Sequence, residues 1–256
     1  MKEEKASIFG LESNFKTKGN GLPLLILHGW GGSSDSWVNV IDILSRNYNV
    51  FCPDFPGFGK SVVPQKAWSL DDYMDWTIKL IDYLDIDKFY LIGHSFGARV
   101  AVKLSCKYPE KIKKLILCNP AGIKMKLNLF QTVIKLMAET GNSIFNFRYL
   151  KVFKDCARSI FYFFIRRKDY AKAKGIMKEV MKNVLKEDLS KCLLDINMPA
   201  LIVWGKRDKI VPVEYAKVFS DSIKGSELII MPDIGHSPHL EAPEELAKAI
   251  LKFINL

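Results

Sequence analysis

The sequence of 256 residues contains no apolar run near the roughly 20 residues that a membrane-spanning helix needs. Residues 1–6 lack the apolar segment of a signal peptide. Cysteine is scarce: there are five, with no Cys-x-x-Cys pair and no spacing to the four histidines that suits a metal site. These absences argue against a membrane-spanning protein and against structural zinc. We therefore expect a cytoplasmic protein with reduced cysteines and without a metal or other cofactor.

Internal repeats, low-complexity tracts and nucleic-acid-binding motifs are also missing, although the formal net charge is +10. Hydrophobic residues make up 48% of the chain and charged residues 26%, which is ordinary for a soluble globular protein. A chain of this length can bury roughly three quarters of its unfolded surface, so a large core is available. Nucleic acid is not an expected partner.

Short apolar runs alternate with segments of helical periodicity through most of the chain. The expected strands are 22–27, 48–52, 89–93, 112–118, 199–204 and 227–231, and the expected helices are 36–46, 70–84, 98–105, 213–222 and 243–253. Ser69 is a candidate N-cap for the second of these helices, with Asp71 and Asp72 in its first turn. Alternation of this kind predicts an α/β fold with a mostly parallel sheet and helices on both faces.

Two segments depart from the alternation. Residues 6–18 alternate weakly between apolar and polar, and Gly19-Asn20-Gly21 predicts a hairpin turn into the next strand. Residues 121–191 show helical patterning only, with expected helices near 127–139, 147–167 and 170–185. We predict a first part of the core over 1–120, a helical cap inserted over 121–191, and a second part of the core over 192–256.

The strongest local pattern is Gly93-His94-Ser95-Phe96-Gly97, which stands between an expected strand and an expected helix. A strand that becomes a helix within one residue forces that residue into a strained turn, and glycine on either side removes Cβ atoms that would collide there. Ser95 would then project at the carboxyl edge of the sheet, with the positive end of a helix dipole behind it. That environment favours a nucleophile.

Two further polar residues follow buried strands. Asp208 comes just after the strand 199–204, and His236 just after the strand 227–231, so both are expected at the same edge as Ser95. A serine hydroxyl needs a base, and His236 would serve as one while Asp208 orients its ring. Asp233 and Asp54 remain alternative acids.

The backbone N–H groups of Trp30 and Phe96 are the expected donors to an oxyanion. Trp30 stands in a glycine-rich loop after the strand 22–27, and Phe96 directly follows Ser95. The three other histidines, His28, His94 and His239, are expected to pack the loops near the site.

Nearly the whole chain resembles the α/β-hydrolase superfamily. The matching segments are His28-Gly29-Trp30-Gly31, Asp54-Phe55-Pro56-Gly57-Phe58-Gly59-Lys60-Ser61, Gly93-His94-Ser95-Phe96-Gly97, Trp204-Gly205-Lys206-Arg207-Asp208 and Gly235-His236-Ser237-Pro238-His239-Leu240-Glu241. The resemblance implies the same nucleophile, acid, base and oxyanion positions. Serine at position 95 distinguishes the chain from dehalogenases and epoxide hydrolases of this fold, which carry a carboxylate there.

Within the superfamily, the chain is similar to the carboxylesterases that demethylate pimeloyl-carrier-protein esters, and then to the carbon–carbon bond hydrolases of ring-cleavage pathways. The latter commonly have Asn where this chain has His94, and Gly-Pro-Gly where it has Gly31-Gly32. We expect a cofactor-independent serine hydrolase that cleaves a carboxylic ester or thioester through an acyl-enzyme on Ser95. The alternatives are a carbon–carbon bond hydrolase and a non-catalytic ligand-binding receptor of the same fold.

The whole excess of positive charge lies in the expected cap. Residues 124–191 hold 16 Lys and Arg against 6 Asp and Glu, and the rest of the chain holds 22 of each. Such a field would attract an acidic carrier protein, a coenzyme A thioester or an anionic surface, and the alternative is a solvated helical face. Aromatic residues between 145 and 164 interleave with this charge and predict an apolar pocket for an acyl group.

Overall fold

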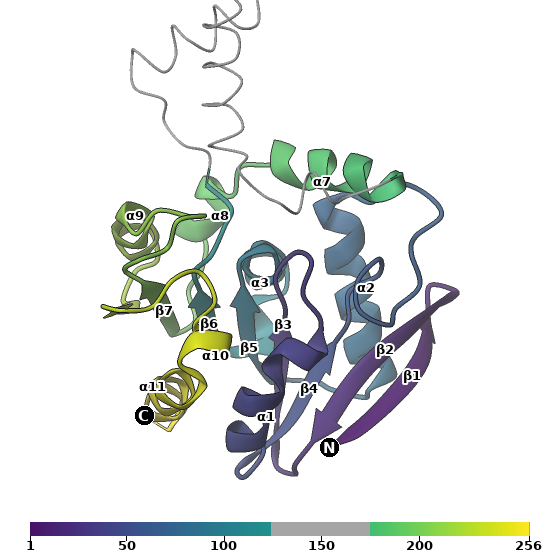
Figure 1. Ribbon diagram of the computed structural model, residues 1–256, viewed down its shortest axis with the longest axis horizontal. Helices are drawn as coiled ribbons and strands as arrows, with labels where there is room; N and C mark the ends of the chain where they lie inside the picture. The colour runs from purple at the N-terminus through teal and green to yellow at the C-terminus, as the bar shows by residue number, and fades with distance from the viewer. Residues whose placement is uncertain (124–174, 256) are drawn as a thin grey trace, which may run out of the picture. The chain divides into compact units, whose positions relative to one another are not determined.

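An eight-stranded sheet runs through the computed structural model of the protein, which describes residues 1–123 and 175–255 (Figure 1). The strands are β1 (Lys2–Ile8), β2 (Leu11–Lys18), β3 (Leu22–Leu27), β4 (Tyr48–Pro53), β5 (Phe89–His94), β6 (Ile112–Cys118), β7 (Ala200–Gly205) and β8 (Glu227–Met231). Their order in the sheet is β1-β2-β4-β3-β5-β6-β7-β8. All pairs from β4 to β8 are parallel, and β1 and β2 add antiparallel pairs at one edge. The predicted α/β fold is confirmed.

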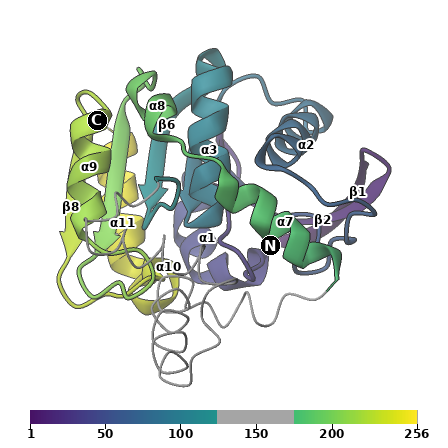
Figure 2. The ribbon, with the colours of Figure 1, turned by 90° about the horizontal axis from the view of Figure 1, so that it is seen from above.

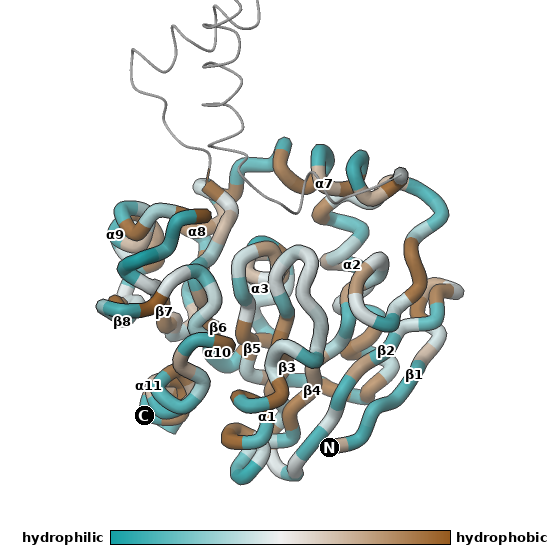
Figure 3. The backbone as a smooth tube through the Cα atoms, viewed as in Figure 1, coloured by the Kyte–Doolittle hydropathy of each residue, from teal (hydrophilic) through white to brown (hydrophobic). Residues whose placement is uncertain are grey.

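The central strands β3, β5, β6 and β7 are mainly apolar because helices cover both faces of the sheet. Every residue of β5 and of β7 is buried. Figure 3 shows the contrast with β1, which is hydrophilic along most of its length and lies at the edge of the sheet. Charged residues on an edge strand hinder pairing with another chain.

Two layers of helix enclose the sheet (Figure 2). One core cluster joins the sheet to α2 (Leu70–Tyr83), α3 (Phe96–Lys107), α7 (Ile176–Lys186), α8 (Ser190–Leu194) and α9 (Glu214–Ser222). The other joins the opposite face to α1 (Val38–Leu44) and α11 (Pro243–Ile254). Three short helices complete the described residues: η1 (Ser34–Trp37), η2 (Pro109–Lys111) and α10 (Pro238–Glu241).

The start of α2 confirms the predicted N-cap. The Ser69 hydroxyl accepts a hydrogen bond from the Asp72 amide at 3.2 Å, and the Asp72 carboxylate accepts one from the Ser69 amide at 2.7 Å. This reciprocal pair satisfies two backbone donors that a helix start leaves without helical partners.

The hairpin predicted at residues 19–21 is wrong. The hairpin lies earlier, where Phe9 and Gly10 connect β1 to β2, and β4 separates β2 from β3. A Cβ atom on Gly19 would lie 2.2 Å from the Tyr48 carbonyl oxygen. The glycines therefore allow the segment between β2 and β3 to pass close to the start of β4, and they do not form a tight turn between paired strands.

Most of the predicted cap lies outside the described residues, including the expected helices 127–139 and 147–167. Helix α7 covers the described part of the expected helix 170–185 and packs in the same cluster as α3. Arg99 of α3 donates hydrogen bonds to the carbonyls of Val184 and Glu187 at the end of α7, at 2.7 and 2.6 Å. The three-part domain division stays a prediction.

No helix in the described part of the chain is long and apolar enough to cross a membrane. The four described cysteines are free thiols. Cys52 and Cys118 are buried, and Cys106 and Cys192 are partly buried.

We predict that Gly97→Ala destabilises the protein by about 3 kcal/mol, the upper end of the usual cost of overpacking. A Cβ atom there would lie 2.1 Å from the Leu27 carbonyl oxygen and 2.6 Å from that of His28, so α3 would have to move away from β3. Urea unfolding measures the change. Gly225→Ala is the control, because its Cβ meets no atom within 4 Å and only its positive φ of 70° costs energy, about 1 kcal/mol. Equal losses in the two variants would contradict the prediction.

Candidate active site

Ser95 occupies a strained turn between β5 and α3. Its φ of 51° and ψ of −106° are unfavourable for a residue with a side chain. The strand and helix approach closely on both sides, since a Cβ on Gly93 would lie 2.7 Å from Ala98 Cα. The fold thus holds a strained serine at the N-terminus of a 12-residue helix, at the carboxyl edge of the sheet.

The structure brings together Ser95, His236 and Asp208, which come from three different strand ends. His236 Nε2 lies 2.9 Å from Ser95 Oγ, and His236 Nδ1 lies 2.7 Å from Asp208 Oδ2. A carboxylate can only accept, so the Nδ1–H donates to Asp208 and Nε2 accepts from the serine hydroxyl. This arrangement can remove the proton from Ser95 and hold the resulting imidazolium beside a negative charge.

The carboxylate of Asp208 is held ionised by its neighbours. Burial alone would raise its pKa, but hydrogen bonds from His236, Asn119 and the Val211 amide together bring the pKa below its ordinary value. Oδ1 accepts from the amides of Ile210 and Val211 at 2.7 and 2.9 Å, and Oδ2 accepts from His236 and Asn119 at 2.7 Å each. Four donors therefore surround the two oxygens.

The backbone around His236 is fixed by side chains from two elements. Glu241 accepts from the Gly235 amide at 2.7 Å and from the Ser237 amide at 3.0 Å, so one carboxylate holds both residues beside the histidine. His94 Nε2 lies 2.8 Å from the His236 carbonyl oxygen and donates to it. These contacts restrict where the imidazole ring can lie.

Sequence reasoning missed the roles of Asn119 and Glu241. Asn119 directly follows β6, and its amide contacts both Asp208 and the Gly235 carbonyl. The rule that selected Asp208 and His236, a polar residue after a buried strand, applies equally to Asn119. Glu241 lies at the end of α10 and does not follow a strand, so that rule does not select it, although it ends the matching segment that contains His236.

The other histidines pack the loops around the site, as expected. His28 Nε2 accepts from the Phe55 amide at 3.0 Å, while Nδ1 lies 2.7 Å from the Gly29 carbonyl. Burial lowers the pKa of His28. His239 stacks on Trp37 with ring centroids 4.4 Å apart, and burial, followed by the charges of neighbouring histidines, lowers its pKa to about 3. Both rings are therefore neutral at physiological pH.

Of the two predicted oxyanion donors, Phe96 directly follows Ser95, and Trp30 follows a glycine that approaches Ser95. The Phe96 amide belongs to the first turn of α3, whose N–H groups point away from the helix. Gly29, which precedes Trp30, is so close that its Cβ would lie 3.4 Å from Ser95 Cβ. The rings of Trp30 and Phe96 meet edge to face, with centroids 5.4 Å apart. The oxyanion role of the two amides stays a prediction.

The two alternative acids lie elsewhere. Asp54 accepts from the Ser34 amide at 2.6 Å, from Asn14 at 3.0 Å and from the Lys60 amide at 2.9 Å, so it joins the loops after β3 and β4. Asp233 forms an exposed ion pair with Arg207. Of the three aspartates, Asp208 is the one that contacts His236.

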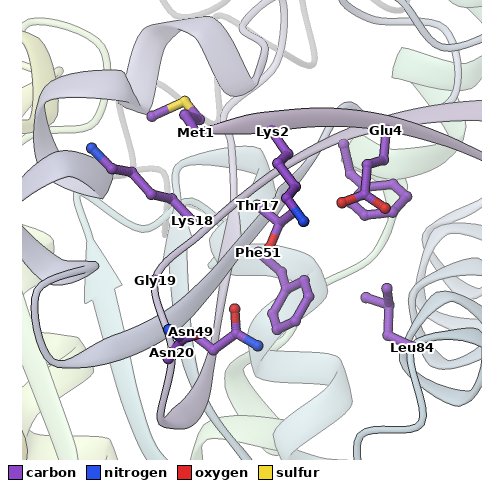
Figure 4. Close-up of a pocket in the computed structure, with 11 residues that line it drawn as sticks. Met1, Lys2, Glu4, Thr17, Lys18, Gly19, Asn20, Asn49, Phe51 and Leu84 are labelled. Atoms are coloured by element: carbon purple, nitrogen blue, oxygen red, sulfur yellow. The ribbon is translucent and has the colours of Figure 1, made fainter.

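A cavity of about 370 Å³ opens at the opposite end of the sheet. Phe51 and Leu84 contribute apolar walls, and Lys18 and Asn20 contribute polar ones (Figure 4). Residues 19–20 precede β3, so the cavity lies at the amino ends of the parallel strands, away from Ser95. Within residues 1–123 and 175–255, no group of His, Cys, Asp and Glu side chains is arranged to hold a metal ion.

Known proteins resemble this chain along most of its length. A 2-hydroxy-6-oxo-6-(2'-aminophenyl)hexa-2,4-dienoic acid hydrolase of Metapseudomonas resinovorans is 27% identical, over 96% of this chain and 88% of the relative. Lipase 3 of a Moraxella species is 28% identical, over 89% of this chain and 75% of the relative. The crystal structure of a serine hydrolase involved in carbazole degradation matches with a TM-score of 0.76 and 27% identity, covering 99% of this chain and 98% of the other.

Residues 23–154 match the family model described as the alpha/beta hydrolase fold. This is slightly more than half of the chain, and it includes Ser95 with the strand and helix that flank it. Ser95, Asp208 and His236 follow parallel strands in that order along the chain, and the α/β-hydrolase fold has the same order of serine, aspartate and histidine. The chain belongs to the α/β-hydrolase fold family.

Proposed function

We propose that this protein is a cofactor-independent serine hydrolase that cleaves a carboxylic ester or thioester through an acyl-enzyme on Ser95. The observation that supports it most directly is the continuous hydrogen-bonded chain from Ser95 through His236 to Asp208, with distances of 2.9 and 2.7 Å. A histidine in this position activates the hydroxyl, and the buried carboxylate stabilises the charge that develops on the ring.

The reaction follows from this arrangement. Ser95 Oγ attacks the carbonyl carbon while His236 Nε2 takes the hydroxyl proton, and the amides of Trp30 and Phe96 stabilise the oxyanion. The tetrahedral intermediate collapses when His236 gives the proton to the leaving alcohol or thiol, and Ser95 remains acylated. A water then attacks the acyl group with His236 as its base, which releases the acid and restores the serine.

The similarity to Lipase 3 supports an ester with an apolar acyl part. The similarity to the dienoic acid hydrolase, over 96% of this chain, supports a second candidate, the hydrolysis of a carbon–carbon bond in a ring-cleavage product. The ester is favoured because His94 occupies the position before Ser95, where the carbon–carbon bond hydrolases commonly have Asn. In this chain, His94 Nε2 donates to the His236 carbonyl oxygen. A non-catalytic ligand-binding receptor of the same fold is the remaining alternative, and a cytoplasmic location stays a prediction from the sequence.

A fluorophosphonate probe followed by peptide mass spectrometry tests the proposal, since it labels an activated serine. We expect one adduct, on Ser95, and a burst of product when p-nitrophenyl esters are mixed with the enzyme. A series of acyl chain lengths then defines the preferred substrate. Turnover of a ring-cleavage dienoate without ester hydrolysis would favour the second candidate, and binding without turnover would favour the receptor.

We further infer that the basic segment 124–191 recruits an anionic substrate such as an acyl carrier protein or a coenzyme A thioester. We expect its hydrolysis to fall steeply between low and moderate salt, because attraction between charged surfaces is screened beyond roughly 8 Å at physiological ionic strength. Hydrolysis of a neutral p-nitrophenyl ester should change little. Steady-state rates over a salt series measure both.

Charge reversal at Arg166, Arg167 and Lys168 is the matched variant. Replacing all three by Glu should lower kcat/KM for the anionic substrate and leave the neutral ester unaffected. The same salt dependence for both substrates would contradict the recruiting role of this segment.

A further inference from the structure

Asn119 lies at the end of β6 and touches the loops that carry both partners of Ser95. Its side chain is fully buried. Nδ2 donates to Asp208 Oδ2 at 2.7 Å and to the Gly235 carbonyl at 3.2 Å, and Oδ1 accepts from the Gly205 amide at 3.3 Å. One amide thus connects the loop that follows β7 with the loop that follows β8.

Both the NH₂ group and the oxygen of this amide have hydrogen-bond partners, and these partners fit only one orientation of the amide. If the group were rotated by half a turn, its NH₂ would face the Gly205 amide, and its oxygen would face the Asp208 carboxylate and the Gly235 carbonyl. Donor would then meet donor, and acceptor would meet acceptor. The Asn119 amide is therefore a fixed part of the site, which neither loop can leave without breaking a buried hydrogen bond.

We propose that Asn119 is a positioning residue for the reaction, acting through Asp208 and His236 without touching the substrate. This inference rests on the proposed serine hydrolase function. Asp208 Oδ2 accepts hydrogen bonds from both Asn119 and His236. The bond from Asn119 therefore weakens the attraction of this oxygen for the His236 imidazole. Its bond to Gly235 fixes the backbone immediately before His236.

The backbone at position 119 explains why asparagine suits it. The φ of 43° lies in the left-handed region, which asparagine tolerates better than most residues with a side chain. Leucine would supply no donor, and aspartate would place a second carboxylate against Asp208. Asparagine meets both the conformational and the hydrogen-bonding requirement.

Two variants separate the amide from the backbone strain. Asn119→Gly removes the amide and relieves the positive φ, whereas Asn119→Ala removes the amide and keeps the strain. Asn14→Ala is the matched control, since Asn14 is also buried and donates to a buried aspartate, Asp54, at 3.0 Å. Asn14 does not contact Asp208 or His236, and we expect it to affect stability but not the pH profile.

The variants are compared by kcat and KM for p-nitrophenyl acetate over a pH series, and by the low-field proton resonance of His236 Nδ1–H. That resonance is identified by its loss in His236→Ala. We expect both Asn119 variants to lower kcat by about 10- to 100-fold, the size of effect that a small misplacement of reacting groups produces, with KM changed by less than about twofold. The acid limb of the profile should move to higher pH, because Asp208 with one donor fewer stabilises the imidazolium more strongly.

Within residues 1–123 and 175–255, the titratable groups that face His236 are Asp208, His94 and His239, and Glu241 holds the amides of Gly235 and Ser237 on either side of it. All four groups are unchanged in these variants. The resonance should move downfield in both Asn119 variants and stay in place in Asn14→Ala. An unmoved acid limb and an unmoved resonance in Asn119→Gly would overturn the proposal and make Asn119 purely structural. Because the resonance needs no turnover, it tests Asn119 even if the wild-type protein hydrolyses no ester.

Discussion

Replacement of Ser95 by alanine is expected to lower kcat for ester hydrolysis by about 10⁴- to 10⁶-fold. The substitution removes the atom that His236 Nε2 contacts at 2.9 Å, so no acyl-enzyme can form. The measurement compares p-nitrophenyl acetate hydrolysis by wild type and variant at equal protein concentration, with fluorophosphonate labelling as the second readout. Near-normal turnover by Ser95→Ala would contradict the proposed mechanism.

His236→Ala should lose nearly as much, and the double variant should lose no more than the worse single one. Residues that act as one unit are strongly non-additive, because each is useful only while the other is present. Additive losses would mean that Ser95 and His236 act in separate steps.

Stability measurements distinguish lost chemistry from lost structure. Ser95 has a φ of 51°, so the fold stores strain at this residue. Ser95→Gly should be as inactive as Ser95→Ala yet more stable than it by about 1 kcal/mol, because glycine adopts positive φ at little cost. Urea unfolding of the two variants makes the comparison.

The sheet and the three residues at its edge follow from the sequence because parallel strands end on the same side. Ser95, Asp208 and His236 each lie in the turn or loop after an apolar strand, so their meeting needed no knowledge of side-chain geometry. The strand before His236, β8, was expected to be buried, but it lies at the edge of the sheet and is largely exposed. That the three residues share hydrogen bonds of 2.7 and 2.9 Å depends on rotamers and loop paths, which a one-dimensional pattern does not contain.

The missed features depend on long-range contacts. The amide of Asn119 meets Asp208 and Gly235, which are 89 and 116 residues away along the chain. The hairpin predicted at residues 19–21 is wrong for a similar reason, because position 19 requires glycine where the chain passes close to the Tyr48 backbone. Local turn statistics describe neighbours in sequence and cannot separate a turn from a close crossing.

Asp208→Asn is expected to lower kcat by up to about 10⁴-fold. An asparagine would turn its oxygen toward the amides of Ile210 and Val211, because the reverse orientation would set its NH₂ against two donors. Its NH₂ would then face His236 Nδ1, which would have to accept. The ring proton would move to Nε2, the atom that must take the proton from Ser95. The loss is measured as kcat for p-nitrophenyl acetate.

The same substitution should destabilise the fold in a pH-dependent way. The native pKa of Asp208 is below its ordinary value, so the ionised carboxylate adds stability that is fully present above the unfolded pKa of about 3.8. That contribution disappears as the pH falls through the lower native pKa. The free energies of unfolding of wild type and Asp208→Asn should therefore differ at neutral pH and converge in acid.

Asp233→Asn is the control for both activity and stability, since Asp233 is exposed and paired with Arg207. A silent Asp208→Asn combined with an inactive Asp233→Asn would assign the acid to Asp233 instead.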